Sequence, residues 1–162
     1  MKVLLVNTNT IKPLIAPIGL EYLGEYLKDN GVDVSVADLS FRTGLPDTIK
    51  RVNPDFIGIG IRNTDDCSFP SAQFLLEEIK GLAGKIREST PAPVVFGGVG
   101  FSVMPEAVLE YLGQDYGIYG DGEEAFLKFI RSYPDIACVP NLVYRKGKRY
   151  VRTARKFFNL EK

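Results

Sequence analysis

The stretch VVFGGVGFSVMPE, from Val94 to Glu106, joins a buried strand to a helix. Its apolar run ends in two glycines, a third glycine follows two residues later, and Met-Pro-Glu then has the form of a helix start, since proline suits the first helical turn. Glycines at the end of a strand are typical of a place where something approaches the main chain closely. The stretch therefore predicts a strand, a loop without bulky side chains and a helix.

The rest of the chain repeats this order. Strands are predicted at 2–7, 32–39, 55–61, 93–98 and 115–120, and amphipathic helices at 18–31, 45–53, 71–90, 105–113 and 122–133. Alternation of this kind predicts a doubly wound α/β fold of the flavodoxin-like, Rossmann-like class, with five parallel strands in the order 2-1-3-4-5. The second strand alternates apolar and polar residues, which favours a place near the sheet edge. A C-terminal β-hairpin is predicted around Lys146, Gly147 and Lys148.

Charge is unevenly distributed along the 162 residues, although the formal net charge is zero. Residues 141–162 hold eight Lys or Arg and one acid, which leaves a net charge of −7 on residues 1–140. With no linker or low-complexity segment, we expect one Rossmann-like domain at 1–140, followed by a basic hairpin segment at 141–162. A basic tail can touch nucleic acid, but a solvated hairpin or a contact with an adjoining domain explains it better, and we expect no nucleic-acid partner.

Several site classes are excluded by composition. The chain has no histidine, which removes histidine-based triads, general bases and metal ligands. Cys67 and Cys138 lack the spacing of a zinc or redox motif and are read as incidental thiols. No apolar run is long enough to span a bilayer, and the N-terminus lacks a signal-peptide pattern, so we expect a cytoplasmic protein without a membrane partner.

Ligands of such folds bind outside the carboxyl ends of the strands. The segments that follow the first, third, fourth and fifth predicted strands converge there and are rich in glycine or small polar residues. From them we take these candidate cofactor-binding residues: Asn7, Thr8, Arg62, Asn63, Asp65, Gly97, Gly98, Gly100, Phe101, Ser102, Gly120, Gly122 and Glu123.

Each group of candidates also has a plain structural interpretation. A tight turn explains one glycine, though less easily the whole set. Residues 62–67 could simply be a solvated loop before a helix capped by Ser68 or Ser71, and Glu123 suits a helix start by its charge alone. Adjacent carboxylates at Asp65 and Asp66 point apart, which argues against a metal site.

Two nucleotide- or phosphate-related classes fit poorly. GVGFSV is half of a dinucleotide fingerprint, but Val103 replaces the last glycine and the motif follows the fourth strand instead of the first. A receiver domain needs an acidic pair after the first strand, where this chain has Asn7, Thr8 and Asn9.

Four segments of the chain, in their order and spacing, resemble the cobalamin-binding domain that precedes the catalytic barrel of cobalamin-dependent radical S-adenosylmethionine enzymes. The segments are PIGLEYLGEYLKDNGVDVSVADL, NPDFIGIGIRNTDD, VVFGGVGFSVMPEAVL and DYGIYGDGEEAF. The hairpin NLVYRKGKRYV resembles the lead-out of that family toward the barrel. The resemblance covers nearly the whole chain. It implies cobalamin held base-off, with its nucleotide tail buried beside the first, third and fourth strands.

The resemblance also implies what the chain lacks. The motif DxHxxG of the best-known cobalamin domains is replaced here by NTNTIKPLIAPIG, so no histidine can ligate cobalt. Arg62 is the candidate neighbour of the lower face, where a cation without a lone pair disfavours a ligand. An iron–sulfur cluster for S-adenosylmethionine needs CxxxCxxC, which is absent. The parent protein would therefore bind S-adenosylmethionine and a [4Fe-4S] cluster in a downstream barrel and transfer a methyl group, whereas this domain alone binds cobalamin and has no catalytic or metal-ligating residue.

Two other functions remain open from the residues. One is a cofactor-free docking module of the same fold, with Arg145, Lys146, Lys148 and Arg149 of the hairpin as its interface. The other is a small flavin or nucleotide binder, since the fold alone is permissive. The cobalamin hypothesis needs a ledge without bulky side chains above the sheet, free of Phe101 and Met104 and wide enough for a nucleotide.

Overall fold

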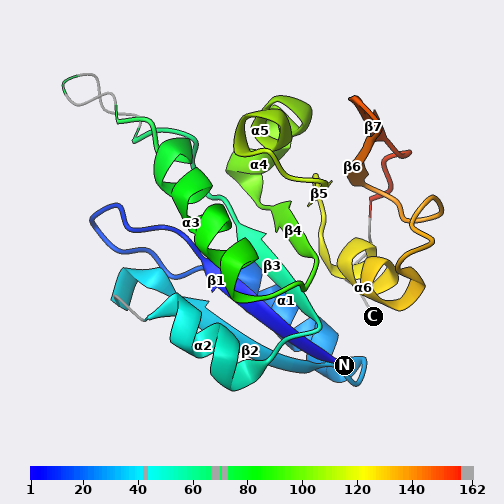
Figure 1. Ribbon diagram of the computed structural model, residues 1–162, viewed down its shortest axis with the longest axis horizontal. Helices are drawn as coiled ribbons and strands as arrows, with labels where there is room; N and C mark the ends of the chain where they lie inside the picture. The colour runs from blue at the N-terminus through cyan, green and yellow to red at the C-terminus, as the bar shows by residue number, and fades with distance from the viewer. Residues whose placement is uncertain (42–43, 67–69, 71–72, 158–162) are drawn as a thin grey trace.

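The computed structural model describes residues 1–41, 44–66, 70 and 73–157. Its strands form one sheet in the order β2-β1-β3-β4-β5-β6-β7 (Figure 1). The strands are β1 (Lys2–Asn7), β2 (Asp33–Asp38), β3 (Phe56–Gly60), β4 (Val94–Gly97), β5 (Tyr116–Ile118), β6 (Leu142–Lys146) and β7 (Arg149–Arg152). The predicted flavodoxin-like order is confirmed, because β1 to β5 are parallel and β2 lies at the edge.

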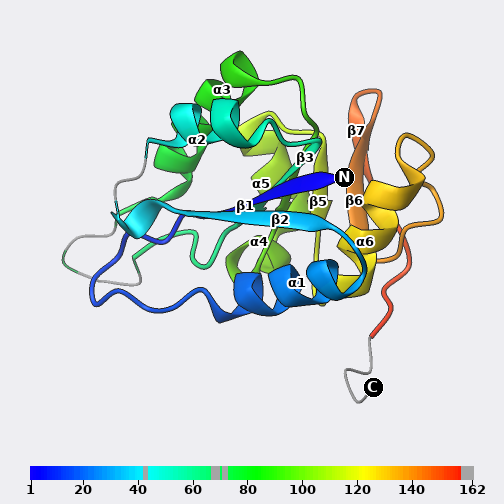
Figure 2. The same cartoon turned by 90° about the horizontal axis from the view of Figure 1, so that it is seen from below.

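Helices cover both faces of the sheet, as Figure 2 shows for α1 on one side and α2 and α3 on the other. The helices are α1 (Ile18–Asp29), α2 (Leu45–Val52), α3 (Leu76–Ser89), α4 (Val99–Val103), α5 (Pro105–Leu112) and α6 (Glu123–Ser132), with a short 3-10 turn, η1, at Leu39–Phe41. One core cluster joins the sheet to α2, α3 and α5, and the other joins it to α1 and α6. Among the described residues, no helix is long and apolar enough to cross a membrane.

Two helical segments differ from the prediction. Helix α3 begins at Leu76 instead of near residue 71, and the predicted caps Ser68 and Ser71, like Cys67, lie outside the described residues. Helix α4 was not predicted, because five residues that include Gly100 carry little helical periodicity. It forms where tertiary contacts hold it, since Phe101 on α4 is completely buried in the core.

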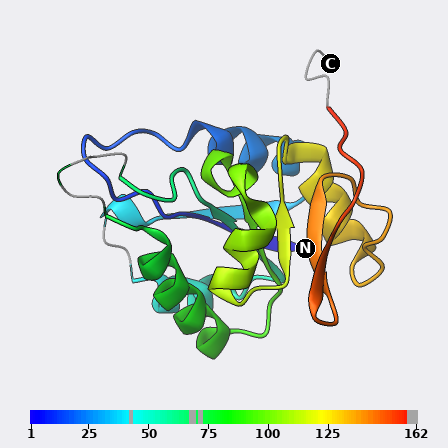
Figure 3. The same cartoon turned by 90° about the horizontal axis from the view of Figure 1, so that it is seen from above.

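The hairpin extends the sheet, which the sequence did not predict. Strand β6 pairs antiparallel with β5, and β7 pairs antiparallel with β6. The turn at Gly147 therefore lies at the amino ends of the parallel strands, and β7 returns the chain to their carboxyl ends. From there the segment after β7 continues past α6 (Figure 3).

Asn141 holds the segments on both sides of the β6–β7 hairpin in place. It is completely buried, and its left-handed backbone (φ 57°) places its amide among three segments. Its Nδ2 donates to the carbonyl of Asp121 at 3.1 Å and to that of Lys156 at 2.9 Å, and its Oδ1 accepts from the Lys156 amide at 2.6 Å. A buried amide with both ends satisfied fixes the segments that it joins. Residues 153–156 are thus held against the loop that follows β5.

Phe101 fixes the position of α4 because its ring occupies the space above Gly117, where a Cβ would lie 2.1 Å from Phe101 Cζ. We expect Gly117→Ala to lower the free energy of unfolding by about 1–3 kcal/mol through overpacking. Adding Phe101→Leu should recover part of this loss, which urea denaturation of the two single variants and the double variant would measure. Additive effects of the two substitutions would contradict the contact.

A second prediction concerns Glu106 of α5, whose carboxylate accepts from Arg152 Nε of β7 at 2.7 Å. This hydrogen bond lowers the pKa of Glu106 below its ordinary value of 4.5. Its stabilisation is therefore present above that value and is lost as pH falls through the lowered pKa. Glu106→Gln should cost about 0.5–1 kcal/mol at neutral pH, since the pair is partly exposed, and almost nothing once Glu106 is protonated.

Urea denaturation across the acidic range measures this pH dependence. Glu110→Gln, on the exposed side of the same helix, is the matched control and should change stability little at any pH. An equal effect of the two substitutions would show that the hairpin is not held by this ion pair.

Candidate functional site

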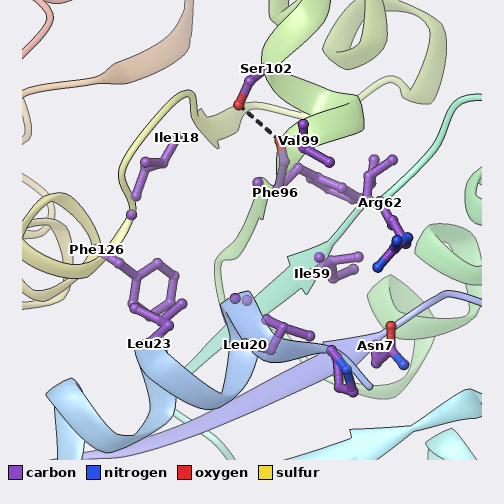
Figure 4. A pocket seen from close by; sticks show the side chains of 18 of the residues that line it. Asn7, Leu20, Leu23, Ile59, Arg62, Phe96, Val99, Ser102, Ile118 and Phe126 are labelled. Carbon is purple, nitrogen blue, oxygen red and sulfur yellow. Dashed lines mark hydrogen bonds between the residues drawn. The ribbon is translucent and has the colours of Figure 1, made fainter. Parts of the chain in front are cut away.

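A cavity of about 630 Å³ opens at the carboxyl ends of the parallel strands, between α1 and α6 (Figure 4). Its walls come from the first half of α1, the ends of β3, β4 and β5, and the first turns of α4 and α6. Leu23 and Phe126 lie close together at one end of it, and Asn7 and Arg62 lie at the other. The place is the one that this fold class predicts for a ligand.

Three glycines form the floor of the cavity. Gly58 and Gly60 alternate along β3, so both face α1 and α6, and Gly60 pairs with Gly97 of β4. A Cβ on Gly58 would meet Leu5 at 2.8 Å and Phe126 at 3.3 Å, and one on Gly60 would meet Leu20 at 3.0 Å. The two β3 glycines therefore permit close packing against α1 and α6, and they also line the cavity.

The cavity is apolar between the helices and polar near the ends of the strands. The apolar part is walled by Leu20 and Leu23 of α1, by Ile118 and by Phe126. The polar part holds four charged side chains, those of Arg62, Asp121, Glu123 and Arg155. A ligand that fits both parts has an apolar portion that enters between the helices and a polar portion that remains near the rim.

The structure brings together most of the predicted site residues. Eight of them line the cavity: Asn7, Arg62, Gly97, Gly98, Ser102, Gly120, Gly122 and Glu123. Thr8 and Asn63 instead line a smaller hollow of about 180 Å³, between the loops after β1 and β3 and helix α3, which also touches Arg62. Asp65, Gly100 and Phe101 line neither.

Gly98 and Gly100 lie in close contact with the protein's own main chain. A Cβ on Gly98, whose φ is +100°, would lie 2.5 Å from the carbonyl oxygen of Ile61, and one on Gly100 would lie 2.7 Å from that of Arg62. The Gly100 amide donates to Ile61 O at 3.0 Å. These two glycines therefore allow the loop after β3 to pack closely against the start of α4. Gly97 and Gly98 line the cavity, whereas Gly100 does not.

Phe101 and Met104 leave the cavity open. Phe101, one of the candidate cofactor-binding residues, is buried in the core on the α3 and α5 side of the sheet. Met104 is 55% exposed and does not line the cavity. Asp65, predicted at the rim, lies further along its loop, in an isolated bridge with Phe74.

Polar side chains fix the loops around the rim. The Ser102 hydroxyl donates to Gly98 O at 2.8 Å and accepts from the Gly120 amide at 2.9 Å, which joins the loops after β4 and β5. Asn7 donates to Asp38 Oδ1 at 3.0 Å, and the Thr8 hydroxyl donates to Gly60 O at 2.9 Å. These bonds hold the rim in place before any ligand arrives.

Sequence reasoning missed the walls of the cavity. Leu20, Leu23 and Phe126 lie within the predicted amphipathic helices, whose periodicity does not show which apolar residues face a cavity. The alternation of Gly58 and Gly60 on one strand face was the available signal for the floor. Arg155 had no local signal, because its position depends on the pairing of β6 with β5. Among the described residues, no group of three or more Cys, Asp or Glu is arranged to hold a metal ion.

The different roles of the rim glycines can be measured. Gly98→Ala should lower the free energy of unfolding by about 2 kcal/mol or more, since it combines a positive φ with a backbone clash. Gly122→Ala is the matched control on the same rim: its φ is −99° and a Cβ there meets nothing within 4 Å. It should change stability by less than about 0.5 kcal/mol. Urea denaturation tests both, and equal effects would refute the assignment.

Comparison with known proteins gives a consistent result. The B12 binding domain family model matches residues 4–130. The tryptophan 2-C-methyltransferase of Streptomyces laurentii is 35% identical over 155 residues, which are 90% of this chain and 26% of that protein. The radical S-adenosylmethionine methyltransferase TsrM from Kitasatospora setae, solved with cobalamin and a [4Fe-4S] cluster bound, superposes with a TM-score of 0.87 at 34% identity, over 99% of this chain and 30% of that one.

A more distant solved structure shares the fold. The cobalamin-dependent S-adenosylmethionine radical enzyme OxsB, solved with aqua-cobalamin bound, superposes with a TM-score of 0.71 at 20% identity, over 97% of this chain and 22% of that one. The chain spans less than a third of the length of each of these relatives.

Proposed function

Because the chain belongs to the B12-binding domain family, we propose that it binds cobalamin, with the nucleotide tail in the cavity between α1 and α6 and the corrin ring above the carboxyl ends of the strands. The observation that carries the proposal is the glycine floor formed by Gly58, Gly60 and Gly97. It leaves a cavity of about 630 Å³, within the usual range for a small-molecule site. In this proposal the planar, largely apolar dimethylbenzimidazole base occupies the apolar part and the corrin remains outside.

A tail placed in this cavity is withdrawn from cobalt, so cobalamin would be held base-off. The chain offers no histidine in place of the base. Arg62 lies with Asn7 at one end of the cavity (Figure 4), and we place it beneath the lower face of the corrin. A guanidinium has no lone pair to donate, so Arg62 would leave that face without a protein ligand. The cofactor supplies a cobalt centre able to accept and pass on a methyl group.

The parent protein, in this proposal, is a cytoplasmic radical S-adenosylmethionine methyltransferase whose barrel also binds S-adenosylmethionine and a [4Fe-4S] cluster. The two methyltransferases of similar sequence support it, because in both this chain matches only about a quarter to a third of a longer protein. Exposed apolar side chains line the cavity, which fits coverage by further protein. They are Ile15 in the loop before α1, Ile18 of α1 and Val99 of α4. Residues 1–140 would form the cofactor domain, and 141–162 the hairpin and lead-out.

The geometry favours a cofactor site over a docking module centred on the hairpin. The basic turn at Lys146 and Lys148 lies at the amino ends of the strands, on the opposite edge from the cavity. A docking role there would leave the glycine floor unexplained. A flavin or nucleotide would use the same cavity, and the spectrum of the bound cofactor distinguishes these ligands from a corrinoid.

The test is to incubate the 162-residue chain with hydroxocobalamin under reducing conditions and to measure retained corrinoid by gel filtration and absorbance. We expect the corrinoid to co-elute, and the Co(II) form to show no nitrogen superhyperfine splitting in electron paramagnetic resonance, as base-off binding without a histidine requires. Leu23→Trp, which fills the apolar part of the cavity, should weaken retention at least tenfold.

Leu27→Met is the matched control for the helix, since Leu27 is completely buried on the same helix, outside the cavity lining. Protein that stays colourless after reconstitution would overturn the proposal. Retention unaffected by Leu23→Trp would show that the tail lies elsewhere.

A further inference from the structure

Arg155 lines the cavity although it lies beyond residue 130, where the family match ends. It reaches the rim because β7 returns the chain to the carboxyl ends of the strands, and because Asn141 binds both the amide and the carbonyl of the next residue, Lys156. The side chain is therefore delivered to the mouth of the cavity by the lead-out segment, on the side of the loop after β5.

The guanidinium of Arg155 is held by packing and has its charge available. It lies against Gly120, where a Cβ would be 3.4 Å from Nη2, and its Cζ is 4.5 Å from the ring centre of Phe157. Gly120 adopts a φ of +73° and leaves room for this contact. Within the part of the chain that the structure describes, no carboxylate lies within ion-pair distance of Arg155.

The neighbouring charges indicate which part of a ligand could meet this group. Asp121 and Glu123 also line the cavity. Because their charges are negative, the mouth does not attract anions at every point. The other cation of the lining, Arg62, stands across the cavity after β3, beside Asn7. Arg155 is thus the cation on the α6 side of the mouth.

Cobalamin carries one phosphodiester, between the corrin side chain and the ribose of its tail. With the base between the helices and the corrin above the rim, this phosphate has to lie at the mouth of the cavity. We propose that Arg155 binds the phosphodiester, so that the lead-out segment is part of the cofactor site; this inference rests on the function proposed above. Arginine suits the role because its planar fork offers paired N–H donors to phosphate oxygens.

Three corrinoids separate the phosphate from the rest of the cofactor: cobalamin, cobinamide phosphate, which has the phosphate but no base, and cobinamide, which has neither. Equilibrium dialysis should show that Arg155→Gln binds cobalamin and cobinamide phosphate at least about tenfold more weakly than the wild type does, which is the usual effect of losing a charge-assisted hydrogen bond. Its affinity for cobinamide should be unchanged. Raising the salt concentration should reduce the difference in cobalamin affinity between Arg155→Gln and the wild type, because salt screens the charge of Arg155.

Lys156→Gln is the matched control, because it removes the same charge one residue away, where Nζ is directed to Glu124 and not to the cavity. It should bind all three corrinoids as the wild type does. An exposed substitution such as Arg155→Gln is expected to fold normally, which thermal denaturation verifies.

The outcomes separate this inference from the proposed function. If the wild type binds cobalamin and Arg155→Gln binds it equally well, or loses cobinamide to the same extent, Arg155 does not bind the phosphate and only the inference fails. If the wild type binds no corrinoid, both fail. A second readout is trypsin cleavage after Arg155, which cobalamin and cobinamide phosphate should slow in the wild type and cobinamide should not; equal protection by all three would contradict the inference.

Discussion

The cavity depends on the absence of three Cβ atoms from one face of the sheet. Gly58, Gly60 and Gly97 lie side by side on β3 and β4, facing α1 and α6. Larger residues there would collide with Leu5, Leu20 or Phe126, or fill the space between sheet and helices. Interiors normally close such gaps, because unfilled space forfeits dispersion contacts. A fold that retains the gap at the carboxyl ends of its strands gives up stability in order to bind something there.

A second constraint acts across the rim. The loops after β3 and β4 touch backbone to backbone through Gly98 and Gly100, and Ser102 extends the connection to the loop after β5. These contacts set the relative height of the three loops, which surround the same opening. The rim is therefore rigid where the corrin would rest, and its geometry does not require the ligand to form. Such preorganisation reduces the entropy lost on binding.

The sequence predicted the class of fold, the strand order and the edge at which the site lies, because these follow from local periodicity and from the rules of parallel sheets. The resemblance to the cobalamin-binding domain of radical S-adenosylmethionine enzymes is confirmed by the family match and by the similarity to TsrM. The contacts of individual side chains are harder to predict from the sequence. Gly98 and Phe101 are close in sequence, yet one meets Ile61 and the other Gly117. Only the packing of remote segments decides this, and no local pattern records it.

The return of β7 to the carboxyl rim has a consequence for any longer chain that contains this domain. Arg155, two residues before Phe157, lines the opening, so a second domain joined to this segment by a short connection would be tethered close to the cavity. Short tethers give effective concentrations in the millimolar range, so even a weak contact between the two domains would be populated most of the time. Opening and closing of the cavity mouth would then require only small rotations about the tether, without separation of the two domains.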